Sequence, residues 1–122
     1  MKTVGFIGLG NMGKGMSTNL SNEDLIVLGY DINEKTFEDL KHSKIDKIND
    51  LKSLTEKSDI IITMLPDGPA VKKVWQEIIS HSRPRQYLID CSTIDVKTSV
   101  LVQKEAQARN LFTLDPSSYI VS

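Results

Sequence analysis

The sequence predicts an α/β protein with a doubly wound, mainly parallel sheet and helices on both faces. Short apolar segments typical of buried strands alternate with segments of helical periodicity along the whole chain. Such alternation favours parallel βαβ units, because a crossover helix returns the chain to the edge where the previous strand began. A glycine-rich turn directly after the first expected strand supports the same fold class.

The expected strands are short, apolar and rich in β-branched residues. The most apolar of them, Ile60–Leu65, is typical of a central parallel strand, and Pro66, Gly68 and Pro69 are expected to break it. Ile45–Ile48 is expected at an edge of the sheet. The other expected strands are Thr3–Ile7, Leu25–Tyr30, Tyr87–Asp90 and Leu111–Leu114.

The expected helices carry apolar residues at three- and four-residue spacing. Met12, Met16 and Leu20, for example, share one helical face. Trp75 lies on the apolar face of another helix, where we expect it to pack in the core. The five expected helices are Asn11–Leu20, Glu34–Lys41, Leu51–Lys57, Ala70–Ser80 and Thr98–Asn110.

Length and composition narrow the class of protein. A chain of 122 residues suits one domain, and a net charge of −1 argues against a broad surface for nucleic acid or anionic membrane. Apolar runs such as Ile60–Ile62 are too short to span a bilayer. The single cysteine gives no internal disulfide, and the first strand begins too early to leave room for a targeting segment. We therefore expect a cytoplasmic protein.

The glycine-rich turn fits the pattern G-x-G-x-x-G of Rossmann-type dinucleotide-binding units, in the expected strand–turn–helix context. Gly8 permits the tight turn, Gly10 lets the backbone approach a pyrophosphate, and Gly13 lets the helix pack closely on the strand. The helix N-terminus adds unpaired N–H groups and partial positive charge. The candidate cofactor residues of this turn are Gly8, Leu9, Gly10, Asn11, Met12 and Gly13.

Asp31 ends the second expected strand, roughly 20 residues beyond the glycines, where a carboxylate can accept hydrogen bonds from both ribose hydroxyls. The same carboxylate would repel a 2′-phosphate, and the nearest cation, Lys35, is expected to be a solvated helix residue. The sequence therefore predicts NAD as cofactor rather than NADP. A plain turn residue or helix N-cap is the alternative for Asp31.

In three segments, Phe6–Leu20, Thr63–Pro66 and Asp90–Asp95, the sequence resembles the β-hydroxyacid dehydrogenases, most closely their 3-hydroxyisobutyrate dehydrogenase branch. Phe6–Leu20 resembles the N-terminal signature of that family. Thr63–Pro66 resembles the loop after the fourth strand, which lies along the cofactor. Asp90–Asp95 resembles the Asp-x-Ser-Thr motif that binds the substrate.

The resemblance implies NAD-dependent oxidation of a small β-hydroxyacid substrate. It places Met64, Leu65, Pro66 and Thr93 beside the cofactor, and Ser92 and Thr93 at the substrate. Ser92 would hydrogen-bond the substrate carboxylate. A helix-capping role remains the alternative for Ser92 and Thr93, and the acid itself stays open among hydroxyisobutyrate, tartronate semialdehyde and related molecules.

The resemblance covers residues 1–115, the expected NAD-binding domain, whereas residues 116–122 depart from the family pattern. The catalytic lysine of the family lies in a helical second domain and has no counterpart here. Lys97 and Lys104 are expected to be solvated charges, and neither His42 and His81 nor any metal-ligand spacing suggests a further site. We expect a truncated product that binds NAD weakly, catalyses nothing alone and self-associates through the surface left by the missing domain.

Three other interpretations remain open. Cys91 precedes the Ser-Thr loop and could be a catalytic thiol, although small buried cysteines are common and no histidine pairs with it in the pattern. A methyltransferase also uses a glycine-rich turn and an acidic ribose contact. A module derived from the dehydrogenases that binds nucleotide or a partner without turnover is the third.

Overall fold

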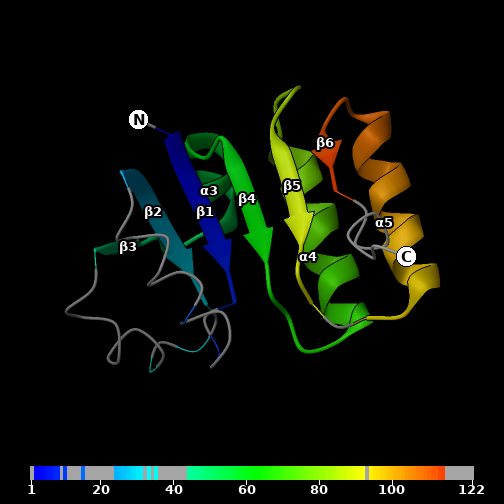
Figure 1. Ribbon diagram of the computed structural model, residues 1–122, viewed down its shortest axis with the longest axis horizontal. Coiled ribbons are helices and arrows are strands. Elements are labelled where there is room, and N and C mark those ends of the chain that lie inside the picture. Colours follow the sequence, from blue (N-terminus) through cyan, green and yellow to red (C-terminus); the bar gives the residue numbers. More distant parts are fainter. Residues whose placement is uncertain are drawn as a thin grey trace.

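A six-stranded, wholly parallel sheet forms the centre of the computed structural model (Figure 1). The structure describes residues 2–8, 10, 15, 24–31, 33, 35, 44–92 and 94–114. The strands, in the order they take across the sheet, are β3 (Ile45–Lys47), β2 (Leu25–Tyr30), β1 (Lys2–Ile7), β4 (Ile60–Thr63), β5 (Tyr87–Asp90) and β6 (Phe112–Thr113). The chain reverses its direction across the sheet between β1 and β4, and this switch point is where open α/β sheets bind ligands. The predicted Rossmann-type α/β fold is thereby confirmed.

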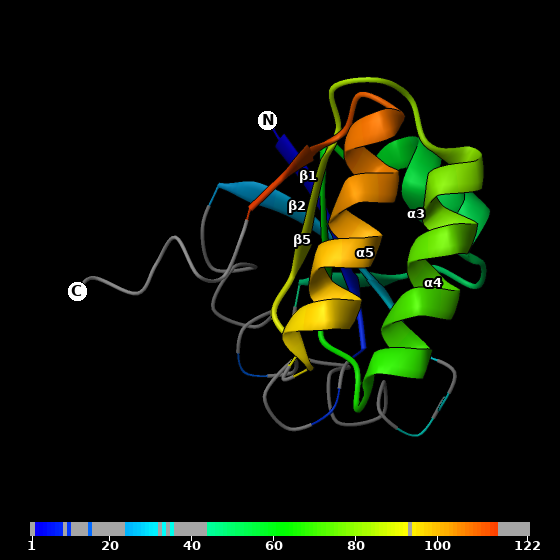
Figure 2. The ribbon, with the colours of Figure 1, turned by 90° about the vertical axis from the view of Figure 1, so that its right-hand side faces the viewer.

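Three helices lie on one face of the sheet (Figure 2): α3 (Leu51–Lys57), α4 (Gly68–His81) and α5 (Val96–Ala108). The two helices expected at residues 11–20 and 34–41 lie outside the described residues, apart from residues 15 and 35. None of the helices among the described residues has both the length and the hydropathy of a membrane-spanning segment.

Each of the three helices begins after an aspartate whose side chain accepts a hydrogen bond from a backbone N–H three residues later. These N-caps are Asp50, Asp67 and Asp95. They explain why α4 and α5 each start two residues earlier than the apolar periodicity predicts. Gly68 and Pro69, which we expected in a strand-breaking loop, are instead the first residues of α4, where the fixed φ of proline suits a helix.

The core fills the space between the sheet and these helices. Its largest fully buried side chains include Phe6, Leu54 and Trp75, so the expectation that Trp75 packs in the core is confirmed. Gly5 of β1 lets α3 approach closely, because a Cβ there would collide with Leu54 and with the Ser58 hydroxyl. Because all six strands run parallel, their carboxyl ends lie at the same edge of the sheet.

Candidate functional site

The carboxyl ends of four neighbouring strands are joined by backbone hydrogen bonds just beyond the sheet. The N–H of Gly8 donates to the carbonyl of Tyr30 at 2.9 Å, and the N–H of Met64 donates to the carbonyl of Ile7 at 2.9 Å. The N–H of Cys91 donates to the carbonyl of Thr63 at 2.8 Å. The segments that sequence analysis singled out, which lie far apart in the chain, therefore leave the sheet side by side.

Gly8 is a position that only glycine can occupy without strain. Its φ is +93°, a backbone conformation that residues with a side chain rarely adopt. A Cβ at this position would also collide with the carbonyl oxygen of Met64. The first glycine of the motif thus makes the tight turn out of β1 and permits close approach of the loop after β4.

Gly10 is exposed, and a Cβ built on it would meet no described atom within 4 Å. Contacts with the described part of the protein therefore do not require glycine at this position. An open approach to the backbone is what a pyrophosphate needs at the second glycine of the motif. The remaining residues predicted for this turn, Leu9, Asn11, Met12 and Gly13, lie outside the described residues.

Asp31 follows β2 and is half-buried at the same edge. Its Oδ1 accepts a hydrogen bond from the N–H of Asn33 at 2.9 Å, and Oδ1 of Asn33 accepts one from the N–H of Lys35 at 3.1 Å. Asp31 is thus a turn residue, as one of the two interpretations proposed. The same carboxylate lies at the edge of the sheet where the loops after β1, β4 and β5 also leave it.

Met64, Leu65 and Pro66 form the loop after β4, and they lie beyond the end of the strand that we expected to continue to Leu65. Met64 and Leu65 are half-buried, and Pro66 is exposed. The N–H of Leu65 donates to Oγ of Ser92 at 2.6 Å. This bond ties the predicted cofactor loop to the predicted substrate loop.

Ser92 belongs to a chain of side-chain hydrogen bonds that runs into the core. Its hydroxyl donates to Oδ1 of Asp90 at 2.7 Å, and the Thr63 hydroxyl donates to the same oxygen at 2.8 Å. The indole Nε1–H of Trp75 donates to Oγ1 of Thr63 at 3.0 Å. Thr93, the other residue predicted for the substrate, lies outside the described residues.

Sequence reasoning did not find the role of Thr63 and Trp75 in this network. One signal was available, because Thr63 is the single hydroxyl residue in a strand that is otherwise isoleucine, and the structure buries it completely. A buried hydroxyl needs a partner. Which residues would supply that partner depends on the packing of α4 and β5, which no local pattern specifies.

Burial raises the pKa of Asp90, and the hydrogen bonds from Ser92 and Thr63 offset part of that effect. The pKa of the Cys91 thiol is raised too, first by desolvation and then by the neighbouring Asp90 carboxylate. Because the thiolate is the nucleophilic form of cysteine, this environment disfavours the catalytic-thiol interpretation of Cys91.

The start of α5 excludes helix capping by Ser92. The N-cap is Asp95, which accepts from the N–H of Thr98 at 3.0 Å and from its hydroxyl at 2.7 Å. A Cβ on Gly68 would lie 3.3 Å from Oδ1 of Asp95, so the N-termini of α4 and α5 also meet at this edge. Farther along α5, Lys97 and Lys104 are exposed, as expected.

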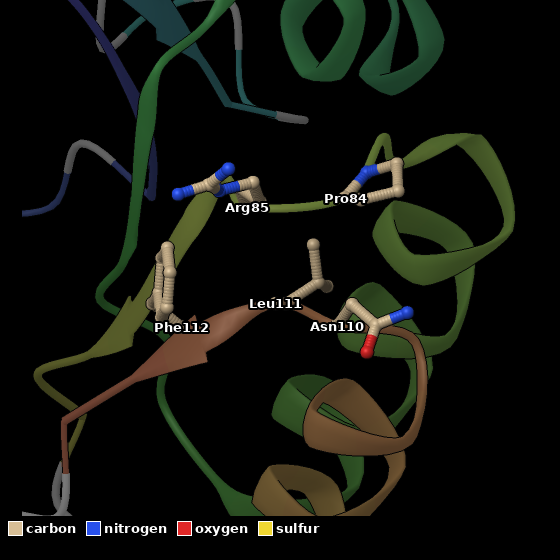
Figure 3. A pocket seen from close by; sticks show the side chains of 5 residues that line it. All are labelled: Pro84, Arg85, Asn110, Leu111 and Phe112. Carbon is tan, nitrogen blue, oxygen red and sulfur yellow. The ribbon is translucent and has the colours of Figure 1, made fainter.

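A shallow hollow of about 420 Å³ lies elsewhere, at the amino ends of β5 and β6 (Figure 3). Its walls come from the turns that precede these strands, with Arg85 and Asn110 in left-handed backbone conformations. The lining residues are Pro84, Arg85, Asn110, Leu111 and Phe112. The hollow is on the edge opposite to the four clustered loops, so we assign it no part in the site.

Comparison with known proteins identifies a family whose model matches this chain. Residues 3–117 match the family model described as the NAD binding domain of 6-phosphogluconate dehydrogenase. A probable 3-hydroxyisobutyrate dehydrogenase of Mycobacterium tuberculosis is 31% identical over 115 residues, which cover 94% of this chain and 39% of the relative. A probable mitochondrial 3-hydroxyisobutyrate dehydrogenase of Dictyostelium discoideum is 35% identical over 117 residues, covering 93% of this chain and 36% of that protein.

Among solved structures, that of 3-hydroxyisobutyrate dehydrogenase from Mycobacterium tuberculosis with L-serine is similar, with a TM-score of 0.88 and 30% sequence identity. The match covers 93% of this chain and 39% of that one. The chain therefore spans about two fifths of the length of these relatives, and the aligned part is their nucleotide-binding portion.

Proposed function

Because the chain belongs to the family of NAD-binding domains represented by that of 6-phosphogluconate dehydrogenase, with 3-hydroxyisobutyrate dehydrogenases among its relatives, we propose that its carboxyl edge binds NAD in preference to NADP. The observation that carries the proposal is the placement of Asp31 at the end of β2, next to the turn that begins at Gly8. NAD and NADP differ only by the phosphate on the adenosine ribose. The cofactor preference is therefore a matter of charge at that ribose.

The described residues fit a dinucleotide. Gly8 forms the turn out of β1, and Gly10 leaves its backbone open to a phosphate. Leu65 and Pro66 border the same edge from β4. A bound nicotinamide would supply the hydride chemistry, and these residues would bind and orient it.

Asp31 supports NAD on electrostatic grounds. Its carboxylate would accept hydrogen bonds from the two ribose hydroxyls of NAD. A 2′-phosphate at the same place would meet a like charge, and each unit pair costs roughly 4 kcal/mol at about 4 Å and an effective dielectric constant of about 20, before screening by salt.

We further propose that this unit serves the oxidation of a small β-hydroxyacid, with the substrate beside the loop of Ser92 and Thr93. The Mycobacterium tuberculosis structure that resembles this chain was solved with L-serine, which carries a hydroxyl group on its β-carbon. We expect the 122-residue chain by itself to bind nucleotide without turning over such an acid, because no residue in it matches the family's catalytic lysine. Steady NADH formation from a β-hydroxyacid by the purified chain would contradict this expectation.

Self-association is a further part of the proposal, with a second copy of this chain as the partner. α5 exposes three large apolar side chains, Val96, Val100 and Leu101, and Val96 is 79% exposed. Clustered apolar surface favours association. Sedimentation at increasing concentration should show a dimer or larger species, and a monomer throughout would contradict this part.

Calorimetric titration with NADH and NADPH tests the cofactor proposal. We expect NADH to bind at least about tenfold more tightly, a difference of about 1.4 kcal/mol. Asp31→Ala should remove that preference. Asp24→Ala is the matched control, because it deletes an exposed carboxylate at the opposite end of the same strand and should keep the preference.

Two results would overturn the proposal. One is equal or tighter binding of NADPH by the unsubstituted chain. The other is no binding of either nucleotide by protein that unfolds cooperatively, which would mean that the described edge does not form a nucleotide site in this chain.

A further inference from the structure

We propose that Asp90 is a positioning residue, which acts through the hydroxyl of Ser92 to hold the Leu65 backbone in place at the nucleotide edge. The inference rests on the proposed function, since it names what fixes the loop that would border the cofactor. It assigns Ser92 a different task from the substrate contact implied by the family resemblance. We call the four side chains Trp75, Thr63, Asp90 and Ser92 the clasp.

The donor groups at the two ends of this chain of hydrogen bonds fix the direction of every bond in it. Trp75 contributes an indole N–H and Leu65 a backbone N–H, and both groups can only donate. Thr63 accepts from Trp75 at 3.0 Å, so its own proton points to Asp90, 2.8 Å away. Ser92 accepts from Leu65 at 2.6 Å, so its proton also points to Asp90, 2.7 Å away.

Both hydroxyl protons therefore converge on Oδ1 of Asp90. That oxygen must act as an acceptor twice, and a proton on it would break one of the two bonds. An apolar side chain at this position would leave the hydroxyls of Thr63 and Ser92 without their acceptor. The chemistry thus requires an sp² oxygen at residue 90, and an amide could supply one as well as a carboxylate.

The inner half of the clasp is buried. Thr63 is fully buried and Trp75 is 1% exposed, with the indole packed in the core. Asp90 is held in position by its hydrogen bond to the buried Thr63, whereas Ser92 and Leu65 lie in loops. Because the clasp links the buried residues to the loops, the Leu65 backbone at the edge of the sheet is held in a fixed position relative to the core.

The clasp also limits what Ser92 can offer to a ligand. Its only proton is donated to Asp90, so the side of Oγ that remains presents a lone pair. A lone pair cannot donate to a substrate carboxylate. As long as Ser92 donates to Asp90, it therefore holds the two loops together, and the donors to a substrate carboxylate must be other groups.

Hydrogen exchange of single backbone amides, followed by NMR on the full chain at neutral pH, tests this inference without any ligand. The Leu65 amide should be protected in the unsubstituted protein. Ser92→Ala and Asp90→Leu should each speed its exchange about tenfold, the effect of losing one hydrogen bond of about 1.4 kcal/mol. The neighbouring Met64 amide, which bonds to Ile7, should keep its rate.

Two variants make the result specific. Asp90→Asn keeps an sp² oxygen and should return Leu65 exchange to within about threefold of the original rate. Ser80→Ala removes a serine hydroxyl that donates to the carbonyl of Glu77 within α4, and it should leave the exchange rate of the Leu65 amide unchanged. The chain has a single tryptophan, so one indole N–H resonance reports in every variant whether the core around Trp75 is intact.

NADH titration of the same variants links the clasp to the site. We expect about tenfold weaker binding for Asp90→Leu and recovery in Asp90→Asn. An unprotected Leu65 amide, or equal acceleration of Met64 and Leu65 exchange, would overturn the clasp. Failure of the unsubstituted chain to bind NADH would overturn the proposed function instead, while the exchange data would still decide whether Asp90 positions the loop.

Discussion

The carbonyl oxygen of Met64 occupies the space that a Cβ on Gly8 would need. The two residues are 56 positions apart in the sequence, one after β1 and the other after β4. Their contact joins the glycine-rich turn to the loop that would run along a cofactor.

Gly8→Ala should destabilise the domain. The substitution forces a side chain into a φ of +93° and into the Met64 carbonyl, so we expect a loss of at least about 2 kcal/mol in the free energy of unfolding. Urea denaturation followed by circular dichroism measures this loss. A variant as stable as the original would show that the turn adopts another conformation in solution.

Gly10→Ala should weaken nucleotide binding and leave the stability of the domain nearly unchanged. A Cβ there meets no described atom, so stability should change by less than about 1 kcal/mol. NADH binding should weaken at least tenfold, about 1.4 kcal/mol, because the methyl group would stand where the pyrophosphate approaches. Calorimetry decides the matter, and unimpaired binding would place the phosphates away from this residue.

Thr63→Val should lower the free energy of unfolding by about 2 kcal/mol, because it leaves the buried indole N–H of Trp75 without an acceptor. Thr55→Val is a matched control. Thr55 is equally buried, but its hydroxyl bonds to the Leu51 carbonyl one turn back in the same helix, so its loss should cost about 1 kcal/mol or less. Equal losses of unfolding free energy in the two variants would show that Thr63 contributes no more to stability than another buried threonine.

Asp90 should make stability fall as the pH rises. Its pKa is raised in the folded protein above the usual 3.8, mainly by burial, so the folded state holds this proton more tightly than the unfolded chain does. The associated stabilisation is complete below about pH 3.8 and is lost as the pH rises through the raised pKa. The lowered pKa values of Asp50 and Asp95 act in the opposite sense, below 3.8.

Urea unfolding of the original chain and of Asp90→Asn, measured from pH 4 to pH 7, isolates that contribution. The free energy of unfolding of Asp90→Asn should gain on that of the original chain as the pH rises, and then level off. A constant difference over this range would show that Asp90 titrates alike in the folded and unfolded states.

Local patterns located many of the elements closely. The bounds of β2, α3 and β5 agree with the sequence prediction at both ends, because each is an apolar or amphipathic run enclosed by polar residues. The prediction ran too far in β4, where Met64 and Leu65 look like strand residues. Both residues are half-buried in the loop, where Leu65 packs against the core, and periodicity cannot separate that position from a place in the strand.

The candidate site was also predictable in part. Gly8, Asp31 and Ser92 were placed at one edge because the carboxyl ends of parallel strands must meet there, and the described residues confirm that placement. What each side chain does at the edge could not be predicted. Ser92 accepts a hydrogen bond from the Leu65 amide, 27 residues away, and no sequence pattern specifies so distant a bond.

The sequence by itself determined the α/β class, the succession of strands and helices, and the glycine turn and acidic residue that point to a nucleotide. These features depend on local periodicity, on the backbone freedom of glycine and on the topology of parallel strands. Only the tertiary structure decided that Met64 lies against Gly8, and that Asp90 gathers the hydroxyls of Thr63 and Ser92. Those relationships arise from the packing of α4 and the sheet, which sets distances between residues that the chain itself leaves far apart.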